Sequence, residues 1–282
     1  MMEEWRLPGY DEQLEKLEIK LLLEAVYLEY GYDFRQYAYP SLRRRIRRRA
    51  LLEKQEDISS LQGRVLHDRD AFERLLSDLV IPVTELFRNP ATFRWLRERL
   101  TDGLRDVSFL RVWHAGCATG EEAYSSAIWL EEEGMLGQAR IYATDISRAA
   151  LNRAREGQLP KDRFPLYDSN YREAGGQSEL SRHCEEEEGF FTFKASLKER
   201  IVFAEHNLAT DRSFNEFHLI FCRNVMIYFD PSLRERVHRL FYESLAPGGI
   251  LVLGGKESLA FTSHADHYET LSEEHRVYRK IE

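Results

Sequence analysis

A glycine-containing turn between an expected strand and an expected helix is the first place in this sequence where chemistry is indicated. Residues 112–122 are Val-Trp-His-Ala-Gly-Cys-Ala-Thr-Gly-Glu-Glu, so Gly116 and Gly120 lie in the turn while Glu121 and Glu122 begin the helix. Glycine allows a ligand to approach the backbone closely, and a helix N-terminus offers free N–H groups. The spacing matches neither the dinucleotide-binding G-x-G-x-x-G fingerprint nor the Walker phosphate loop with its lysine.

The two carboxylates of this turn indicate which ligand it favours. Glu121 and Glu122 would repel a phosphate but could receive the ammonium group of a methionine moiety. The pair therefore favours S-adenosylmethionine (AdoMet) over a nucleotide phosphate. The alternative is that both glutamates only complement the dipole of the helix that they begin.

An acidic residue ends the next expected strand. Asp145 follows Tyr142-Ala143-Thr144, roughly 20 residues past the glycine turn, where doubly wound folds place an acid against a ribose diol. It could instead cap the following helix. Because Ser147 is available for that cap, we interpret Asp145 as a ribose ligand.

A third segment follows a later strand. Residues 221–229 are Phe-Cys-Arg-Asn-Val-Met-Ile-Tyr-Phe, and ligands of doubly wound folds bind outside the carboxyl ends of such strands. Methyltransferases that act on amino groups of DNA usually place Asn/Asp-Pro-Pro-aromatic here. Val225 and Met226 replace those prolines, so that substrate class is not indicated. Tyr228 and Phe229 could also serve only to pack the start of the next helix.

An alternation of strands and helices is expected to position these motifs. The expected strands are 109–113, 139–144, 200–204, 217–222 and 250–253, the helices 121–133, 147–156 and 231–245, with a last antiparallel strand at 275–280. This order predicts an α/β fold whose doubly wound, mostly parallel sheet is covered by helices on both faces. Residues 158–199 interrupt the alternation, and we expect an insertion with limited β structure there.

Residues 1–80 are expected to form a small all-helical domain. Apolar residues recur at helical spacing between residues 11 and 30, Gly31 is a plausible stop, and further helices are expected from Pro40, after Ser59 and over 70–79. We expect residues 81–98 to form a linker and a connecting helix, and residues 99–282 to form the ligand-binding domain.

Six arginines between residues 43 and 49 give the helical domain a basic segment. At helical spacing Leu42, Ile46 and Ala50 can face the core, and the other face is shared by Arg43, Arg44, Arg47 and Arg48. An acidic helix is the natural partner of such a face. A solvated face without a partner is the alternative, and nucleic acid is disfavoured by the net charge of -8.

Composition limits the cellular setting. The 282 residues contain no apolar run near the ~20 residues of a membrane span and no secretory signal pattern, so we expect no membrane insertion. The three cysteines are far apart, which indicates neither a disulfide framework nor a zinc site. We expect a cytoplasmic protein without a bound metal.

Four motifs in register resemble the chemotaxis-receptor glutamate methyltransferases, the CheR-type family. They are Thr84-Glu85-Leu86-Phe87-Arg88, the glycine turn, the Cys-Arg-Asn-Val-Met-Ile-Tyr-Phe segment and Leu245-Ala246-Pro247-Gly248-Gly249. The resemblance covers nearly the whole chain, including Tyr30-Gly31-Tyr32-Asp33-Phe34-Arg35 and the arginine-rich helix. It implies a class I AdoMet-dependent methyltransferase domain preceded by a small all-α domain.

The resemblance also implies roles for individual residues. Thr84 and Arg88 would help to close the AdoMet site, with Gly116 and Gly120 in its turn. Glu122 would meet the methionine end and Asp145 the ribose. Asn207 and Leu208 would lie near the adenine, and Asn224 and Val225 would line the site. Arg88 and Tyr228 would face the reacting carboxylate.

The activity that these roles imply is O-methylation of glutamate side chains on a signalling or chemoreceptor-type protein. The enzyme would act as a monomer on an acidic helical segment bound by the arginine face. A glutamate is already an anion at neutral pH, so positioning and desolvation suffice and no general base is required. Two rivals remain: a catalytically reduced AdoMet-binding regulatory module, and a methyltransferase of small-molecule carboxylates.

Three departures from the family pattern put the substrate in question. Pro82 stands where an asparagine is often found. The usual Gly-His-Ser-Glu corresponds to Gly255-Lys256-Glu257-Ser258, so a side chain near the site would differ. The insertion at 158–199 does not resemble the short receptor-tail-binding subdomain of the enteric enzymes.

Overall fold

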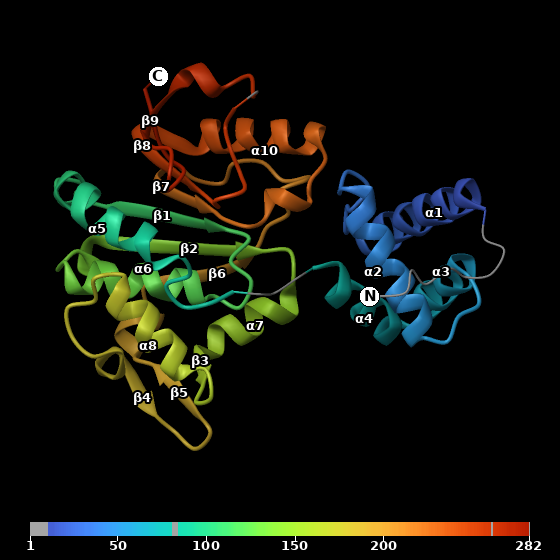
Figure 1. The fold of residues 1–282 in the computed structure, drawn as a ribbon, viewed down its shortest axis with the longest axis horizontal. Helices are drawn as coiled ribbons and strands as arrows, with labels where there is room; N and C mark the ends of the chain where they lie inside the picture. The colour runs from blue at the N-terminus through green and yellow to red at the C-terminus, as the bar shows by residue number, and fades with distance from the viewer. Residues whose placement is uncertain (1–10, 81–83, 261, 282) are drawn as a thin grey trace. The chain divides into compact units, whose positions relative to one another are not determined.

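The computed structural model describes residues 11–80, 84–260 and 262–281. The chain divides into two compact units: Met1–Ile81 with Tyr228–Leu233, and Pro82–Ile227 with Arg234–Glu282. Figure 1 shows the helices of the first unit and the sheet of the second. Pro82 lies outside the described residues, so its departure from the family pattern has no structural account.

The first unit is helical, as expected. Its helices are α1 (Glu12–Tyr30), α2 (Tyr39–Leu52), α3 (Ile58–His67) and α4 (Arg69–Leu79). The side chains of Asp11, Asp57 and Asp68 accept hydrogen bonds from the backbone at the starts of α1, α3 and α4. Gly31 ends α1 in the left-handed conformation (φ 77°), which glycine adopts without steric cost.

The second unit is built on a seven-stranded sheet with the order β6-β2-β1-β7-β8-β10-β9. The strands are β1 (Leu110–Ala115), β2 (Ala139–Asp145), β6 (Ile201–Glu205), β7 (Phe217–Cys222), β8 (Leu245–Leu253), β9 (Tyr268–Ser272) and β10 (Val277–Lys280). The first five pair in parallel, whereas β10 runs antiparallel to both β8 and β9. The expected mostly parallel sheet is confirmed, but strand β9 was missed and β8 begins at Leu245 instead of residue 250.

Helices cover both faces of this sheet. They are α5 (Pro90–Arg105), α6 (Glu121–Glu132), α7 (Arg148–Glu156) and α10 (Pro231–Ser244). Val112 belongs to the core cluster that includes α5 and α6 residues such as Leu96 and Ile128. Its neighbour Trp113 points to the opposite face, where its ring meets Phe241 of α10 with the centroids 5.5 Å apart.

The chain changes direction across the sheet beside β1. From β1 it proceeds to β2 and β6 on one side and then returns to β7 and β8 on the other. Ligands of such sheets bind outside the carboxyl ends of the strands at this switch point. The predicted site residues that follow β1, β2 and β7 lie at the carboxyl ends of these strands.

The insertion at 158–199 forms a small antiparallel sheet with the order β3-β5-β4 and two helices that the sequence did not predict. Its elements are β3 (Gln158–Pro160), α8 (Phe164–Glu173), β4 (Cys184–Glu186), β5 (Phe190–Phe193) and α9 (Ala195–Lys198). The remaining short elements are the 3-10 turns η1 (Leu136–Gln138), η2 (Leu180–His183), η3 (Met226–Tyr228) and η4 (Ala265–His267). Helix α8 shows little periodicity because only Tyr167 and Tyr171 are buried in it.

Candidate active site

The glycine turn connects β1 to α6 and is hydrogen-bonded to the carboxyl end of β2. The backbone N–H groups of Gly116 and Cys117 both donate to the carbonyl of Thr144, at 2.8 and 2.9 Å. Gly116 and Gly120 have φ angles of 79° and 91°. A Cβ atom on Gly116 would lie 2.5 Å from Cγ2 of Val225, so glycine is required for this contact. The structure thus brings together two predicted site residues, Gly116 and Val225.

Asp145 lies at the end of β2 and its carboxylate holds two backbone groups. Oδ2 accepts from the N–H of Ala118 and Oδ1 from the N–H of Ser147, both at 2.8 Å. Ser147 itself caps α7 by accepting from Ala150. Burial raises the pKa of Asp145, and the backbone hydrogen bonds oppose that rise. Each carboxylate oxygen keeps a further lone pair, which fits a ribose hydroxyl.

The two glutamates of the turn have different surroundings. Glu121 accepts from the hydroxyl of Thr119 at 2.7 Å, and burial raises its pKa. Glu122 pairs with Nη1 of Arg223 at 2.7 Å and with Nδ1 of His114 at 3.1 Å. Burial opposes its charge, but the charge of Arg223 and the His114 hydrogen bond lower its pKa overall. Glu122 is therefore an anion with two protein partners, and its contact with the methionine end stays a prediction.

Arg223 is a residue of this region that the sequence did not single out. Its side chain is 2% exposed, and both terminal nitrogens donate to the carbonyl of Arg88 at 3.1 Å. Nη2 also donates to Oδ1 of Asn89 at 2.8 Å. Arg223 thus ties the segment before α5 to Glu122 on α6. The only sequence indication was a charged residue directly after a buried strand.

The segment that contains Arg88 is anchored on both sides. The buried Phe87 donates its N–H to Oγ of Ser125 at 2.7 Å. The carbonyl of Leu86 accepts from Asn170 at 3.1 Å. Arg88 itself is half-buried, as is Thr84 four residues earlier. The anchors fix the backbone of Arg88 within this unit, and the roles of Arg88 and Thr84 stay predictions.

A second missed residue, Glu257, organises the turn after β7. Its buried carboxylate accepts from the N–H groups of Asn224, Val225, Met226 and Gly254. Counted from Gly254 instead of Gly255, the segment Gly-Gly-Lys-Glu keeps a glutamate at the fourth position, as in Gly-His-Ser-Glu. The departure then lies in the two middle positions, and the acid itself is present.

The predicted adenine neighbours follow β6, beside Asp145. The strands β2 and β6 pair so that Asp145 is opposite Glu205, and His206 donates to the carbonyl of Asp145 at 3.2 Å. The side chain of Asn207 accepts from Ala209 at 2.9 Å, and Leu208 is 7% exposed. These two residues therefore lie at the same edge of the sheet as Asp145.

Tyr228 belongs to the helical unit, whereas Arg88 belongs to the other unit. The guanidinium of Arg45 lies 4.8 Å from the centre of the Tyr228 ring, and the carbonyl of Tyr228 accepts from Ala38 at 2.8 Å. Phe229 packs against Tyr37. Packing is thus an observed role of this pair, and the joint role of Tyr228 with Arg88 stays a prediction.

Fewer arginines of the basic face are available to a partner than helical spacing predicts. Arg43 and Arg47 both pair with Glu15, a carboxylate of α1 that is only 1% exposed. Arg48 lies 3.6 Å from Asp78 but keeps a side chain that is 69% exposed. Arg44 is also exposed. Two of the four predicted recognition residues therefore serve the helical unit itself, which leaves Arg44 and Arg48 to present charge.

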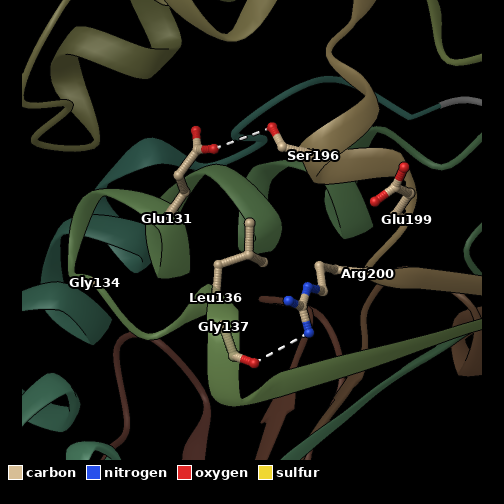
Figure 2. Close-up of a pocket in the computed structure, with 7 residues that line it drawn as sticks. All are labelled: Glu131, Gly134, Leu136, Gly137, Ser196, Glu199 and Arg200. Atoms are coloured by element: carbon tan, nitrogen blue, oxygen red, sulfur yellow. Dashed lines mark hydrogen bonds between the residues drawn. The ribbon is translucent and has the colours of Figure 1, made fainter.

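A shallow pocket of about 350 Å³ lies elsewhere, and Figure 2 shows the residues that line it. They are Glu131, Gly134, Leu136, Gly137, Ser196, Glu199 and Arg200. These residues end α6 or precede β2 and β6, so the pocket is at the amino ends of the strands. It is separate from the predicted site at their carboxyl ends.

Within residues 11–80, 84–260 and 262–281, no helix combines the length and apolar character needed to cross a membrane. Within the same residues, no group of three or more His, Cys, Asp or Glu side chains could hold a metal ion.

Comparison with known proteins adds independent information. A protein of Pseudomonas putida named putative methyltransferase Cher3 is 44% identical over 269 residues, covering 95% of this chain and 98% of the relative. A chemotaxis protein methyltransferase of Listeria monocytogenes is 30% identical over 231 residues, covering 81% and 85%. An uncharacterized 104.1 kDa protein of Rhodobacter capsulatus is 33% identical over 282 residues, and the match spans 97% of this chain but 29% of that protein.

The chain also matches both parts of one family. Residues 82–277 match the SAM-binding domain of the CheR methyltransferases, and residues 17–80 match their all-alpha domain. These matches confirm the class I AdoMet-dependent methyltransferase fold with a small all-α domain in front. Because they span nearly the whole sequence and agree with the arrangement of helices and sheet, this chain belongs to the CheR methyltransferase family.

Proposed function

We propose that this protein transfers the methyl group of AdoMet to glutamate side chains of a signalling or chemoreceptor-type protein and so forms methyl esters. Several relatives that are about 30% identical are named chemotaxis protein methyltransferases. The observation that most favours the proposal is the meeting of Gly116, Asp145 and Val225 at the carboxyl ends of the strands, where ligands of doubly wound folds bind.

AdoMet fits the polar groups of this edge. Asp145 keeps acceptor capacity for ribose hydroxyls while it holds the glycine turn. Oδ1 of Asn224 is buried and has no hydrogen-bond partner among the described residues, so it can accept from a donor of the ligand. Buried acceptors are normally satisfied, and a bound ligand would supply the missing donor.

The chemistry requires orientation more than activation. A glutamate carboxylate with a pKa near 4.3 is already nucleophilic at neutral pH. Arg88 can bind a carboxylate through two parallel hydrogen bonds, and its backbone is fixed by Arg223. Alignment of the carboxylate with the methyl group and removal of water would then provide the acceleration.

The proposed protein substrate is an acidic helix. Arg44 and Arg48 give α2 an exposed cationic surface that complements such a helix. The enzyme would work as a monomer in the cytoplasm. A regulator without catalysis and a methyltransferase of small carboxylates are the two rivals, and neither explains both Arg88 and this surface.

Transfer of labelled methyl groups tests the proposal. Wild-type protein is incubated with methyl-labelled AdoMet and with the soluble and membrane proteins of its host, while AdoMet binding is measured by calorimetry. We expect a labelled protein band with the wild type and a much weaker band with Arg88→Ala. Binding of AdoMet without any labelled protein would favour the regulatory module, and label only in small molecules would favour the other rival.

A further inference from the structure

We infer that Glu257 is a positioning residue that holds the turn Asn224–Met226 against the glycine turn and thereby shapes the AdoMet site. This inference rests on the proposed function, since it specifies how part of the proposed site is built. Glu257 lies four residues after the end of β8 and is 5% exposed. None of the roles proposed above uses its carboxylate as a ligand.

The carboxylate uses both oxygens to hold backbone. Oε1 accepts from the N–H groups of Val225 and Met226 at 2.9 and 2.8 Å. Oε2 accepts from Asn224 and Gly254 at 2.9 and 2.7 Å. One anion therefore satisfies three consecutive donors of the turn after β7 and joins them to the end of β8.

This arrangement stabilises a backbone that would otherwise be disfavoured. Asn224 has a φ of 62°, in the left-handed region that residues other than glycine seldom adopt. Strained residues persist where surrounding contacts determine them strongly, and such positions cluster at functional sites. The hydrogen bonds that Glu257 accepts from residues 224–226 are contacts of this kind.

The consequence reaches the glycine turn through Val225. Its Cγ2 atom would lie 2.5 Å from a Cβ atom on Gly116, so the valine side chain closes directly on that turn. The same turn holds Oδ1 of Asn224, which is buried and has no hydrogen-bond partner in the part of the chain that the structure describes. Glu257 thus fixes two groups that we propose to face AdoMet, without touching the cofactor itself.

An isosteric variant separates this role from a general effect on folding. In Glu257→Gln, either placement of the amide directs its NH2 group at two backbone N–H donors, so at least two of the bonds are lost. Glu269→Gln is the matched control, because Glu269 is exposed on β9 and pairs at the surface with Arg279 at 3.2 Å. If the carboxylate merely stabilises the fold, its loss in Glu257→Gln should lower the melting temperature and leave the AdoMet affinity of the folded protein unchanged.

The experiment combines calorimetric AdoMet titration, turnover and amide NMR on the full chain. We expect Glu257→Gln to raise the Kd for AdoMet at least about tenfold and to shift the amide resonances of residues 224–226 upfield, with Glu269→Gln unchanged in all three. If the glutamine variant does not fold, Glu257→Asp replaces it, because aspartate keeps the charge but cannot reach all the donors, and the same tenfold threshold applies.

The outcomes separate this inference from the proposed function. A folded variant with wild-type Kd, turnover and amide resonances overturns the positioning role while wild-type methylation still supports the function. If the wild-type protein neither binds AdoMet nor methylates, the proposed function fails. The amide resonances of Glu257→Gln then still decide whether the carboxylate holds the turn, and unchanged resonances overturn the inference.

Discussion

The guanidinium of Arg223 and the carboxylate of Glu122 form a buried ion pair in which Nη1 lies 2.7 Å from Oε2. The pair joins the end of β7 to the first turn of α6, and Arg223 extends the connection to the carbonyl of Arg88. Removing one partner of a buried pair leaves an uncompensated charge, which typically costs about 3–5 kcal/mol, whereas replacing both is far less harmful.

A double-mutant cycle should reveal this coupling. We expect Arg223→Met and Glu122→Leu each to lower the free energy of unfolding by several kcal/mol, roughly the magnitude above. The double variant should recover part of the loss, because no buried charge remains unpaired. Urea denaturation of the four proteins measures the effect. Losses that simply add would mean that the two side chains do not depend on each other.

Asp145 offers a test of the ribose assignment. Asp145→Ala should weaken AdoMet binding by about 1.5–3 kcal/mol, the usual contribution of a hydrogen bond to a charged acceptor. Glu205→Ala is the matched control, since Glu205 is the residue opposite Asp145 on β6 and is exposed. Because Asp145 also holds Ala118 and Ser147, thermal unfolding must first show that the variant is folded. Equal AdoMet affinities of the wild type and a folded Asp145→Ala protein would remove Asp145 from the ribose site.

The four predicted recognition arginines should separate into two classes. Arg44→Glu should slow protein methylation without changing stability or AdoMet affinity, because its side chain is exposed. Arg47→Glu should destabilise the helical unit, because it places a second negative charge beside the buried Glu15. The methylation rate of the wild type should fall as salt rises, since exposed charges are screened over about 8 Å at physiological ionic strength. A rate unaffected by both Arg44→Glu and salt would favour a solvated face without a partner.

A buried polar network around His183 predicts how stability depends on pH. Nδ1 of His183 lies 2.8 Å from Glu131, and Nε2 lies 3.4 Å from Glu132. Glu132 also accepts from Tyr171 and pairs with Arg97, which in turn approaches Glu133 at 3.5 Å. Burial opposes the positive charge of His183 and the negative charge of Glu132. Glu131 and Glu132 nevertheless raise the pKa of His183. The hydrogen bonds from His183 and Tyr171 and the charge of Arg97 lower the pKa of Glu132 to about 2.

The two pKa shifts make the free energy of unfolding fall at opposite ends of the pH range, at high pH for His183 and at low pH for Glu132. The contribution of His183 should be complete below its unfolded pKa of about 6.5 and should be lost as the pH rises through its higher folded value. The contribution of Glu132 should be present above its ordinary pKa of 4.5 and lost as the pH falls toward 2. Urea denaturation across this range should therefore give the wild type a lower free energy of unfolding above neutrality than at pH 6. In His183→Gln this decline above pH 6 should be shallower. The same decline above pH 6 in both proteins would contradict the claim that protonated His183 stabilises the fold.

The elements that the sequence predicted well are those whose pattern is local. Strands β2 and β7 each contain a short apolar segment, residues 141–143 and 219–222, and α1 has an apolar stripe that ends before Gly31. Helix α8 was missed because it buries only two residues. The start of β8 was missed because Pro247-Gly248-Gly249 indicates a turn, whereas the structure continues the strand through a register shift opposite β7.

The site shows the same division. The positions of Gly116 after β1 and of Asp145 at the end of β2 could be predicted, because a glycine turn and an acid follow successive strands at a familiar spacing. The roles of Arg223 and Glu257 could not be predicted, because they depend on partners 101 and 33 residues away that only the fold brings near. The internal pairing of Arg43 and Arg47 was missed for a related reason, because helical spacing shows which residues share a face but not that a neighbouring helix supplies Glu15.

The chemical nature of the product tests the central claim most directly. A glutamyl methyl ester hydrolyses in mild alkali and releases volatile methanol, whereas a methylated nitrogen survives. Protein labelled by this enzyme with methyl-labelled AdoMet should therefore lose its label as methanol after brief base treatment, and peptide mass spectrometry should place the added methyl group on glutamate. Label that persists through alkali, or that maps to lysine, arginine or nucleic acid, would contradict the account even if AdoMet binding were demonstrated.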